Sequence, residues 1–354
     1  MNEDIFFSVI LPSYNMEAYI KQAIECLMRQ TYNRLEIIVV DDCSTDGTRI
    51  IAENYEKCNS SVTVLHHEEN RGLSASRNSG LKIARGNYVL FMDPDDILEE
   101  NALETVALAL KGKRADVLVF SLAEDYYDEH GNVAYSVVHS LPTQYLTEQK
   151  AIHEAVKDLE AETMYGYAWN KIYNRAYLEH FGNTFNDVPH IEDFTFNVGV
   201  FENVKDVVIL SDVLYHYRNA NQVRLTSKYL PNYFELQKTR VSTFLGQQKK
   251  WETYDKKAAT IAANAYFRSF MSSIQRDIEH GLDIKAIRIK AKEELSTPLY
   301  IELKGDLNPK GKVAKILYKP LAEGKVDTAI NRAKMIAYVK TKHPNLFAKL
   351  KQSR

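Results

Sequence analysis

Short apolar runs alternate with amphipathic stretches of helical length over the first 121 residues, and this alternation limits the possible folds more than any other feature. The runs are rich in β-branched residues and predict strands at 7–11, 35–40, 62–66, 88–92 and 116–121. The stretches between them predict helices at 17–29, 46–57, 74–84 and 99–111. Runs such as IIVV and VLVF are apolar on both faces, which is typical of parallel strands covered by helices. The pattern therefore predicts an α/β fold with a mainly parallel central sheet.

The rest of the chain changes character twice. Residues 125–225 are mixed and aromatic-rich, with a strand expected at 207–217, and they continue the first domain. After residue 229, apolar residues recur at three- and four-residue spacing, which predicts a helical C-terminal region. Its helices are expected at 232–248, 255–280, 284–295, 313–321 and 326–339. We therefore expect a first domain at 1–228, a helical region at 229–303 and a basic helical tail at 304–354.

The net charge of -2 conceals an uneven distribution. Residues 304–354 hold 13 Lys or Arg against 3 Asp or Glu, so this tail carries +10 and the first 303 residues carry -12. Such a tail suits an anionic lipid surface or an anionic acceptor polymer, and a plain solvated helical surface is the alternative. Nucleic acid is not an expected partner, because no nucleic-acid-binding motif accompanies the charge.

The cellular location of the protein is suggested by sequence features that we do not find. No run approaches the roughly 20 apolar residues of a membrane span, and the start, MNEDIFF, carries acids where a signal peptide is basic. The three cysteines are odd in number and lie in no CxxC spacing, so neither a disulfide framework nor a zinc site is expected. We expect a cytoplasmic protein, peripheral at the inner face of the cell membrane if its tail binds lipid.

Polar clusters follow the ends of three predicted strands. They are Pro12-Ser13-Tyr14-Asn15, Asp41-Asp42 and Asp93-Pro94-Asp95-Asp96. Ligands of parallel α/β sheets bind beyond the carboxyl ends of the strands, so the three clusters are expected to share one crevice.

The two acidic clusters suggest different chemistry. Three carboxylates in Asp93 to Asp96 repel one another unless a cation lies among them, and oxygen ligands suit Mg²⁺ or Mn²⁺ bridging to a substrate diphosphate. A carboxylate of Asp41 or Asp42 can accept the imide N–H of a uracil or thymine ring. Helix capping is the alternative for both clusters.

The order and spacing of these motifs resemble the family 2 glycosyltransferases of GT-A fold. The resemblance rests on SVILPSYNMEAYIKQAIECLMRQTYNRLEIIVVDDCSTDGT and NRGLSASRNSGLKIARGNYVLFMDPDDIL, and it covers roughly residues 6 to 110. AWNKIYNRAYL, IEDFTFNVGVF and LYHYR resemble the acceptor half of that family and extend the match to about residue 220. The resemblance implies a Rossmann-like nucleotide-sugar-binding domain and an inverting hexosyl- or N-acetylhexosaminyltransferase of the type that builds bacterial cell-surface polysaccharide or teichoic acid.

The resemblance also implies roles for individual residues. Asp193 of the Glu192-Asp193 pair would be the catalytic base, although two acids opening a helix can also serve its dipole. A metal, Mn²⁺ or Mg²⁺, would be held by Asp95 and Asp93, with His216 either an added ligand or a packed, hydrogen-bonded side chain. The implied contacts to the nucleotide-sugar come from Pro12, Tyr14, Asn15, Glu17, Asp41, Asp42, Arg77, Asp93, Asp96, Lys171 and Arg218.

The expected reaction follows from these groups. An acceptor hydroxyl is a poor nucleophile, so a carboxylate that takes its proton on the face opposite the leaving nucleotide assists a single displacement with inversion. The expected partners are a nucleotide-sugar donor, with UDP-sugars the default, and a glycan, lipid-linked saccharide or teichoic-acid-like acceptor. A non-catalytic carbohydrate-binding or complex-forming subunit on the same fold is the alternative. A nucleotidyltransferase would carry a glycine- and arginine-rich loop where this chain has Pro12 to Asn15.

Overall fold

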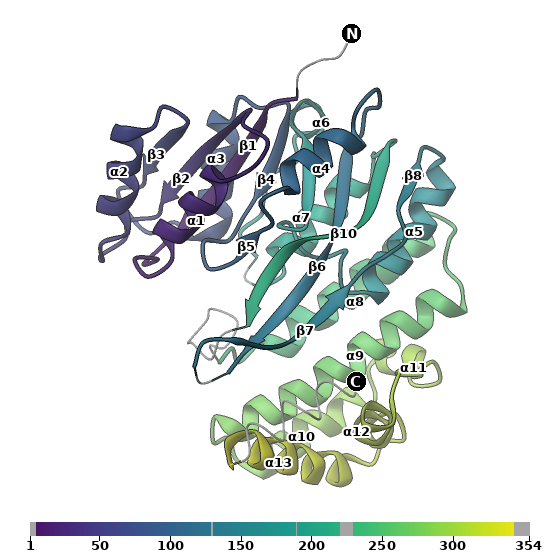
Figure 1. Cartoon of the computed structure of the whole chain (residues 1–354). Helices are drawn as coiled ribbons and strands as arrows, with labels where there is room; N and C mark the ends of the chain where they lie inside the picture. The colour runs from purple at the N-terminus through teal and green to yellow at the C-terminus, as the bar shows by residue number, and fades with distance from the viewer. Residues whose placement is uncertain (1–4, 129, 189, 220–228, 343–354) are drawn as a thin grey trace. The chain divides into compact units, whose positions relative to one another are not determined.

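The computed structural model describes residues 5–128, 130–188, 190–219 and 229–342, and the chain divides into two compact units (Figure 1). The first unit spans residues 1–222 and the second spans 223–354. The predicted domain boundaries at residues 228 and 303 stay predictions. Each unit is described separately below.

The first unit is built on a ten-stranded sheet. One set of parallel strands follows the order β3-β2-β1-β4, formed by β1 (Phe7–Ser13), β2 (Leu35–Asp41), β3 (Val62–His66) and β4 (Tyr88–Phe91). The order then continues through β9 (Lys171–Asn174), β6 (Val117–Tyr127), β10 (Val207–Asn219) and β5 (Ile97–Leu98). Two further strands pair outside this path, β7 (Val133–His139) with β6 and β8 (Gln144–Leu146) with β10.

The α/β fold class is confirmed, but the sheet is less parallel than the sequence predicts. Strand β9 lies between β4 and β6 and runs antiparallel to both, and β5, β7 and β8 are also antiparallel to their neighbours. Strand β9 has only four residues, KIYN, so it contains no apolar run by which the sequence would reveal it.

Seven helices accompany the sheet in the described part of the first unit. They are α1 (Ile20–Met28), α2 (Thr48–Cys58), α3 (Gly72–Ile83), α4 (Ala102–Ala109), α5 (Gln149–Ala161), α6 (Arg175–Phe181) and α7 (Glu192–Phe201). The four predicted N-terminal helices are all present. Helix α1 begins at Ile20 and not at the predicted residue 17, because residues 16 to 19 form a turn.

A glycine sets the distance between α3 and the sheet. A Cβ atom at Gly80 would lie 2.5 Å from Cγ2 of Ile10 in β1 and 3.2 Å from Cγ2 of Val40 in β2. No larger residue fits there without moving the helix or its neighbours. The close approach matters because α3 also carries Arg77.

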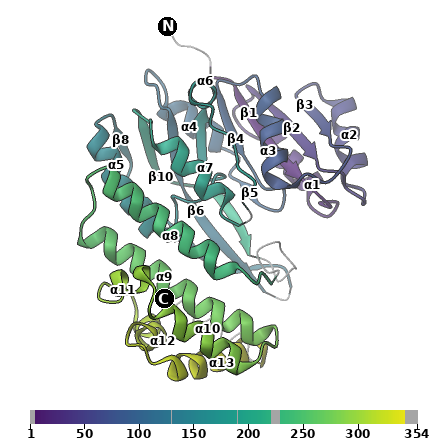
Figure 2. The same cartoon turned by 180° about the vertical axis from the view of Figure 1, so that it is seen from behind.

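The second unit is helical, as predicted. Helix α9 (Lys256–Glu279) contacts the five others, which are α8 (Tyr233–Lys250), α10 (Ile284–Glu294), α11 (Pro298–Leu303), α12 (Lys312–Ala322) and α13 (Val326–Lys342) (Figure 2). Its core includes the buried rings of Tyr266, Phe267 and Phe270. Among the described residues, none of the helices has the length and apolar character needed to span a bilayer.

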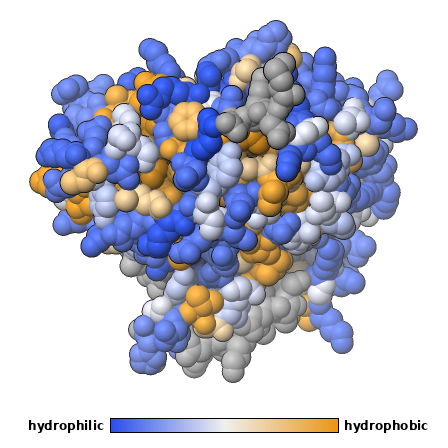
Figure 3. All heavy atoms as spheres, turned by 45° about the horizontal axis from the view of Figure 1, so that its top comes forward, coloured by the Kyte–Doolittle hydropathy of each residue, from blue (hydrophilic) through white to orange (hydrophobic). Residues whose placement is uncertain are grey.

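In the face shown in Figure 3, small apolar areas are separated by charged and polar residues. Scattered apolar groups of this kind are normal for a protein surface and need no partner.

Candidate active site

The carboxyl ends of β1, β2 and β4 meet at one edge of the sheet, as the sequence predicts. Ser13 at the end of β1 pairs with Asp41 at the end of β2, and Ile10 of β1 pairs with Phe91, the last residue of β4. The polar segments that follow these strands therefore begin next to one another.

The segment after β1 is tied to the segment after β2. Asn15 has a positive φ of 53°, and its Oδ1 accepts a hydrogen bond of 2.8 Å from the Thr45 amide. Glu17 Oε2 accepts one of 2.9 Å from the Gly47 amide. Pro12 is buried within β1, whereas the Tyr14 ring is 44% exposed and available to a ligand. The two segments thus form one rigid rim.

The two aspartates at the end of β2, Asp41 and Asp42, are each hydrogen-bonded to a histidine. Asp41 Oδ2 lies 2.8 Å from Nδ1 of His66, and Asp42 Oδ1 lies 2.7 Å from Nδ1 of His67. Asp42 also accepts hydrogen bonds from the amides of Arg71 and Gly72, at 2.9 and 2.8 Å. It therefore fixes the start of α3 in addition to any ligand it binds.

The acidic turn after β4, Asp93 to Asp96, is organised by Tyr215, a residue to which the sequence motifs assign no role. Tyr215 of β10 donates a hydrogen bond of 2.8 Å to Oδ2 of Asp96 and accepts one of 3.2 Å from the Asp93 amide. Burial, together with the charges of its acidic neighbours, raises the pKa of Asp96 well above its usual value. The same causes raise the pKa of Asp93 to about 6, although Arg77 opposes the shift.

Arg77 joins the acidic turn to the predicted base. Its side chain is 1% exposed; Nη1 donates to Oδ1 of Asp193, and Nη2 donates to Oδ1 of Asp93 at 3.2 Å. Its guanidinium also lies over the Phe185 ring, 5.1 Å from the centroid. Burial alone would lower the pKa of Arg77, but the charges of Asp193 and Asp93 raise it, so the guanidinium is always charged.

Asp193 and Glu192 open α7. Asp193 is 16% exposed, and its Oδ2 accepts a hydrogen bond of 3.0 Å from the Ala168 amide, a backbone donor that has no signal in the sequence. Glu192 has a buried Oε2 for which the described residues supply no hydrogen-bond partner. Burial and the charge of Asp193 raise the pKa of Glu192 to about 7.

Lys171 is not among these groups, which corrects its predicted contact with the diphosphate. It is fully buried, and Nζ donates to the carbonyls of Met164 and Tyr167 and to Oδ1 of Asn170, at 2.7, 2.5 and 2.8 Å. An ammonium has three N–H groups, so none remains for a phosphate.

His216 and Arg218 of β10 are also engaged within the protein. Nδ1 of His216 lies 2.8 Å from Oδ2 of Asp125, and its Nε2 lies 2.8 Å from Oε1 of Glu99. This is the alternative given above, a hydrogen-bonded side chain, and ligation of a metal would require one of these bonds to break. The Arg218 amide donates to Asp96 at 3.0 Å, and its Nη1 donates to Oε1 of Gln22.

The described residues contain no group of three or more His, Cys, Asp or Glu side chains arranged to hold a metal ion. The donor set of the acidic turn is oxygen only, and Asp95 in it is partly exposed. Oxygen ligands of this kind suit a hard cation such as Mg²⁺ or Mn²⁺.

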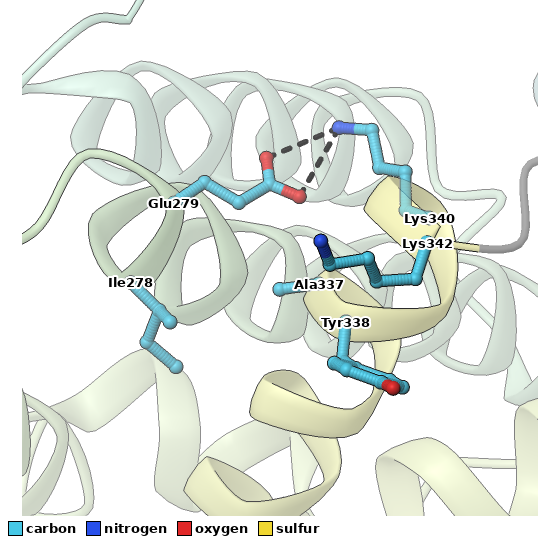
Figure 4. Close-up of a pocket in the computed structure, with 6 residues that line it drawn as sticks. All are labelled: Ile278, Glu279, Ala337, Tyr338, Lys340 and Lys342. Carbon is cyan, nitrogen blue, oxygen red and sulfur yellow. Dashed lines mark hydrogen bonds and ion pairs between the residues drawn. The ribbon is translucent and has the colours of Figure 1, made fainter.

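Two further features can be assigned. Trp169 is buried in a stack, 4.5 Å from the rings of both Tyr167 and Tyr215, so it belongs to the core. A hollow in the second unit, between the end of α9 and α13, is lined by Ile278, Glu279, Ala337, Tyr338, Lys340 and Lys342 (Figure 4). It contains no residue of the predicted site, and its Glu279 is paired with Lys340.

Comparisons with known proteins agree with this geometry. Residues 8–182 match the family model "Glycosyl transferase family 2". The chain is 31% identical over 260 residues to "Putative glycosyltransferase EpsH" of Bacillus subtilis (strain 168), covering 72% of this chain and 73% of EpsH. It is also 31% identical over 220 residues to the poly(ribitol-phosphate) beta-N-acetylglucosaminyltransferase TarS of Staphylococcus aureus (strain Mu50 / ATCC 700699), covering 61% of this chain and 36% of TarS.

Among solved structures, residues 1–349 of S. aureus TarS in complex with UDP-GlcNAc superpose with a TM-score of 0.64 at 22% identity. The match covers 93% of this chain and 91% of that chain. At this identity the likeness establishes a shared GT-A fold.

Proposed function

Because this chain belongs to glycosyl transferase family 2, we propose that it moves a sugar from a UDP-sugar to an acceptor hydroxyl by a single displacement, with inversion at the anomeric carbon. The observation that carries the proposal is the buried guanidinium of Arg77, which binds Asp93 after β4 and Asp193 at the start of α7. A single displacement needs one acidic group near the leaving diphosphate and one near the incoming hydroxyl. The two carboxylates bound to Arg77 are suited to these two positions.

Asp193 acts as the general base in this proposal. Arg77 and the Ala168 amide each bind one of its oxygens, which fixes the orientation of the carboxylate. Each carboxylate oxygen has a second lone pair, so Asp193 can still take the proton of an acceptor hydroxyl. Glu192, whose buried Oε2 faces no donor among the described residues, lies beside the base and holds a proton below about pH 7.

The nucleobase of the donor is recognised by Asp42, the residue that follows β2. Asp42 is nearly fully buried and accepts bonds from His67, Arg71 and Gly72, which hold its carboxylate in one orientation. We propose that it accepts the imide N–H of uracil, with Tyr14 beside the ring. The relative TarS, solved with UDP-GlcNAc and with UDP, supports a uridine donor.

The leaving diphosphate is handled by the acidic turn after β4. We propose that Asp95, with Asp93, holds Mn²⁺ or Mg²⁺ together with the donor diphosphate. The bound metal offsets the negative charge that the diphosphate gains as the bond to the sugar breaks. The raised pKa of Asp93 and of Asp96 supports this role, since burial first and the charges of neighbouring carboxylates second disfavour their ionised forms, and a bound cation would offset both effects.

The acceptor is proposed to be a glycan, a lipid-linked saccharide or a teichoic-acid-like polymer, and the tail is proposed to work at an anionic membrane surface. Helix α12 exposes Lys312, Lys315 and Lys319 at helical spacing around Ile316, which is 57% exposed. A basic helix face that carries an apolar residue is suited to anionic lipid.

The proposal is tested by measuring UDP release from a panel of UDP-hexoses and UDP-N-acetylhexosamines with Mn²⁺. We expect turnover of at least one donor by the wild type, and a loss of roughly a hundredfold or more in the Asp193→Asn variant with UDP binding retained. Absence of turnover with every donor would contradict the proposal. Equal rates for wild type and variant would remove Asp193 as the base.

A further inference from the structure

Lys171 is a buried cation whose bonds all go to one loop. The loop of residues 164–170, here the 164–170 loop, connects α5 to β9. Lys171 at the start of β9 donates to the Met164 carbonyl at one end of the loop, and to the Tyr167 carbonyl and the Asn170 side chain further along. One side chain therefore fixes the loop at three points.

A second side chain ties the same loop to α7. Asn197 is fully buried, and its Nδ2 donates to the Tyr167 carbonyl at 3.1 Å and to the Asp193 carbonyl at 2.9 Å. Its Oδ1 accepts a hydrogen bond of 2.8 Å from Tyr173 of β9. The Tyr167 carbonyl is thus shared between Lys171 and the helix that begins with Glu192 and Asp193.

The 164–170 loop presents one group to the predicted base. The Ala168 amide, in the residue after Tyr167, donates to Oδ2 of Asp193 at 3.0 Å. The other oxygen of Asp193 is bound by Arg77, so the loop provides one of the two bonds that orient this carboxylate. Movement of the loop would rotate or release it.

We propose that Lys171 is a positioning residue for the transfer reaction, because it anchors the 164–170 loop so that the Ala168 amide holds the carboxylate of Asp193. This inference rests on the proposed role of Asp193 as base. It assigns Lys171 an indirect role, with no contact to the donor, the metal or the acceptor.

The hydrogen bonds of Lys171 support the same role. Burial lowers the pKa of Lys171 well below its usual value, while the charges of Asp193 and Glu160 oppose the shift. Only the protonated amine has three N–H groups for its three acceptors, so these acceptors also oppose the loss of the proton.

Lys171→Met tests the proposal, since it keeps an unbranched side chain only one atom shorter and removes the ammonium. The Met164 and Tyr167 carbonyls keep one partner each, from Asn170 and Asn197, so the variant should fold with a loosened loop. We expect kcat for UDP release to fall roughly tenfold or more, because displacement of a catalytic group by a fraction of an ångström has effects on this scale. The Kd for UDP with Mn²⁺ should stay within about twofold of wild type, because the donor-side groups are untouched.

A milder pair of variants keeps the test valid if Lys171→Met does not fold. Tyr173→Phe removes only the hydroxyl that orients Asn197, and kcat should fall about threefold with an unchanged Kd for UDP, since a smaller displacement has a smaller effect. Tyr177→Phe is the matched control, because that hydroxyl bonds to the Val200 carbonyl near the other end of α7. The control should keep the wild-type kcat.

The outcomes separate this inference from the proposed function. An unchanged kcat in Lys171→Met, or a kcat and a UDP affinity that fall together, would overturn the positioning role. Equal kcat losses in Tyr173→Phe and Tyr177→Phe would also overturn it. If Asp193→Asn keeps the wild-type rate, the proposed base fails; if Asp193→Asn is inactive while Lys171→Met is fully active, only the positioning role fails.

Discussion

Arg77 and Asp193 lie 116 residues apart in the sequence and form a direct ion pair at the carboxyl edge of the sheet. The same guanidinium binds Asp93, so the acidic turn after β4 and the start of α7 share one buried cation. Arg77 therefore links the acidic turn to the start of α7, and loss of Arg77 should affect both.

Arg77→Gln is expected to lower the free energy of unfolding by about 3 kcal/mol, because it leaves Asp93 and Asp193 without their partner. It should also reduce kcat by a hundredfold or so, since the base is no longer oriented. Urea unfolding, followed by the fluorescence of Trp169 in a Trp251→Phe background, measures the first effect. Arg49→Gln is the control: its pair with Glu53 is on the surface, so it should cost no more than about 0.5 kcal/mol. Equal costs would contradict the account.

Gly80→Ala is expected to displace α3, because the new Cβ would lie 2.5 Å from Cγ2 of Ile10. Overpacking of this kind lowers the free energy of unfolding by about 1–3 kcal/mol. Because Arg77 lies on the same helix, kcat should also fall. The exposed Gly246 of α8 is the matched helical control, since a Cβ there meets nothing within 4 Å. Gly246→Ala should be neutral or stabilising by up to about 1 kcal/mol. A stable, fully active Gly80→Ala variant would show that α3 tolerates the shift.

Asp42→Asn is expected to weaken UDP binding by about tenfold. The side-chain NH₂ of asparagine replaces one carboxylate oxygen, whereas the backbone N–H of Gly72 and the uracil imide both require an acceptor. Isothermal titration with UDP and Mn²⁺ measures the change. Asp116→Asn is the control. Asp116 directly precedes β6, and its side chain also accepts hydrogen bonds from two backbone amides, those of Lys205 and Asp206. Asp116→Asn should reduce stability and leave UDP binding intact. Equal losses of UDP affinity in Asp116→Asn and Asp42→Asn would argue against recognition of uracil by Asp42.

The pH dependence of stability should change in Glu192→Gln. Burial and the charge of Asp193 raise the pKa of Glu192 from 4.5 to about 7, so between these values the folded state holds a proton that the unfolded state has released. The contribution of Glu192 to wild-type stability is therefore full below about pH 4.5 and is lost as pH rises through about 7, and the variant lacks this contribution. Relative to wild type, Glu192→Gln should be more stable at pH 8 than at pH 5 in urea unfolding. A constant difference between the two proteins would exclude the shift.

Replacement of Lys312, Lys315 and Lys319 by Glu should reduce sedimentation with vesicles of phosphatidylglycerol and phosphatidylcholine, because it reverses the charge of the exposed face of α12. UDP binding should be unaffected. The control replaces three exposed lysines of the first unit, Lys57, Lys82 and Lys111, with Glu. Equal vesicle binding by all three proteins would reject the membrane surface.

The fold is largely readable from the sequence because its parallel strands are buried on both faces and therefore appear as unbroken apolar runs. The strand ends then bring Asp41, Asp42 and Asp93 to one edge without further information. Strand β9 escapes this reading because its four residues include Lys171 and Asn174, whose burial depends on partners elsewhere in the chain.

The site is less readable than the fold, since its decisive contacts are tertiary. Nothing near Lys171 in the sequence indicates that backbone carbonyls surround its ammonium, and the motif alone suggests a phosphate contact. The Ala168 amide has no side-chain signature at all. Tyr215 is visible in LYHYR, but its bonds to Asp93 and Asp96 follow only from the pairing of β10 with β5.

The measurement that tests the central claim most directly is the anomeric configuration of the first-formed product, followed by ¹H NMR during hydrolysis of an α-linked UDP-sugar with the diamagnetic Mg²⁺. A single displacement assisted by Asp193 predicts that the β-anomer appears first, and that Asp193→Asn forms it far more slowly. First formation of the α-anomer would contradict inversion, and with it the assignment of Asp193 as the base of a single displacement.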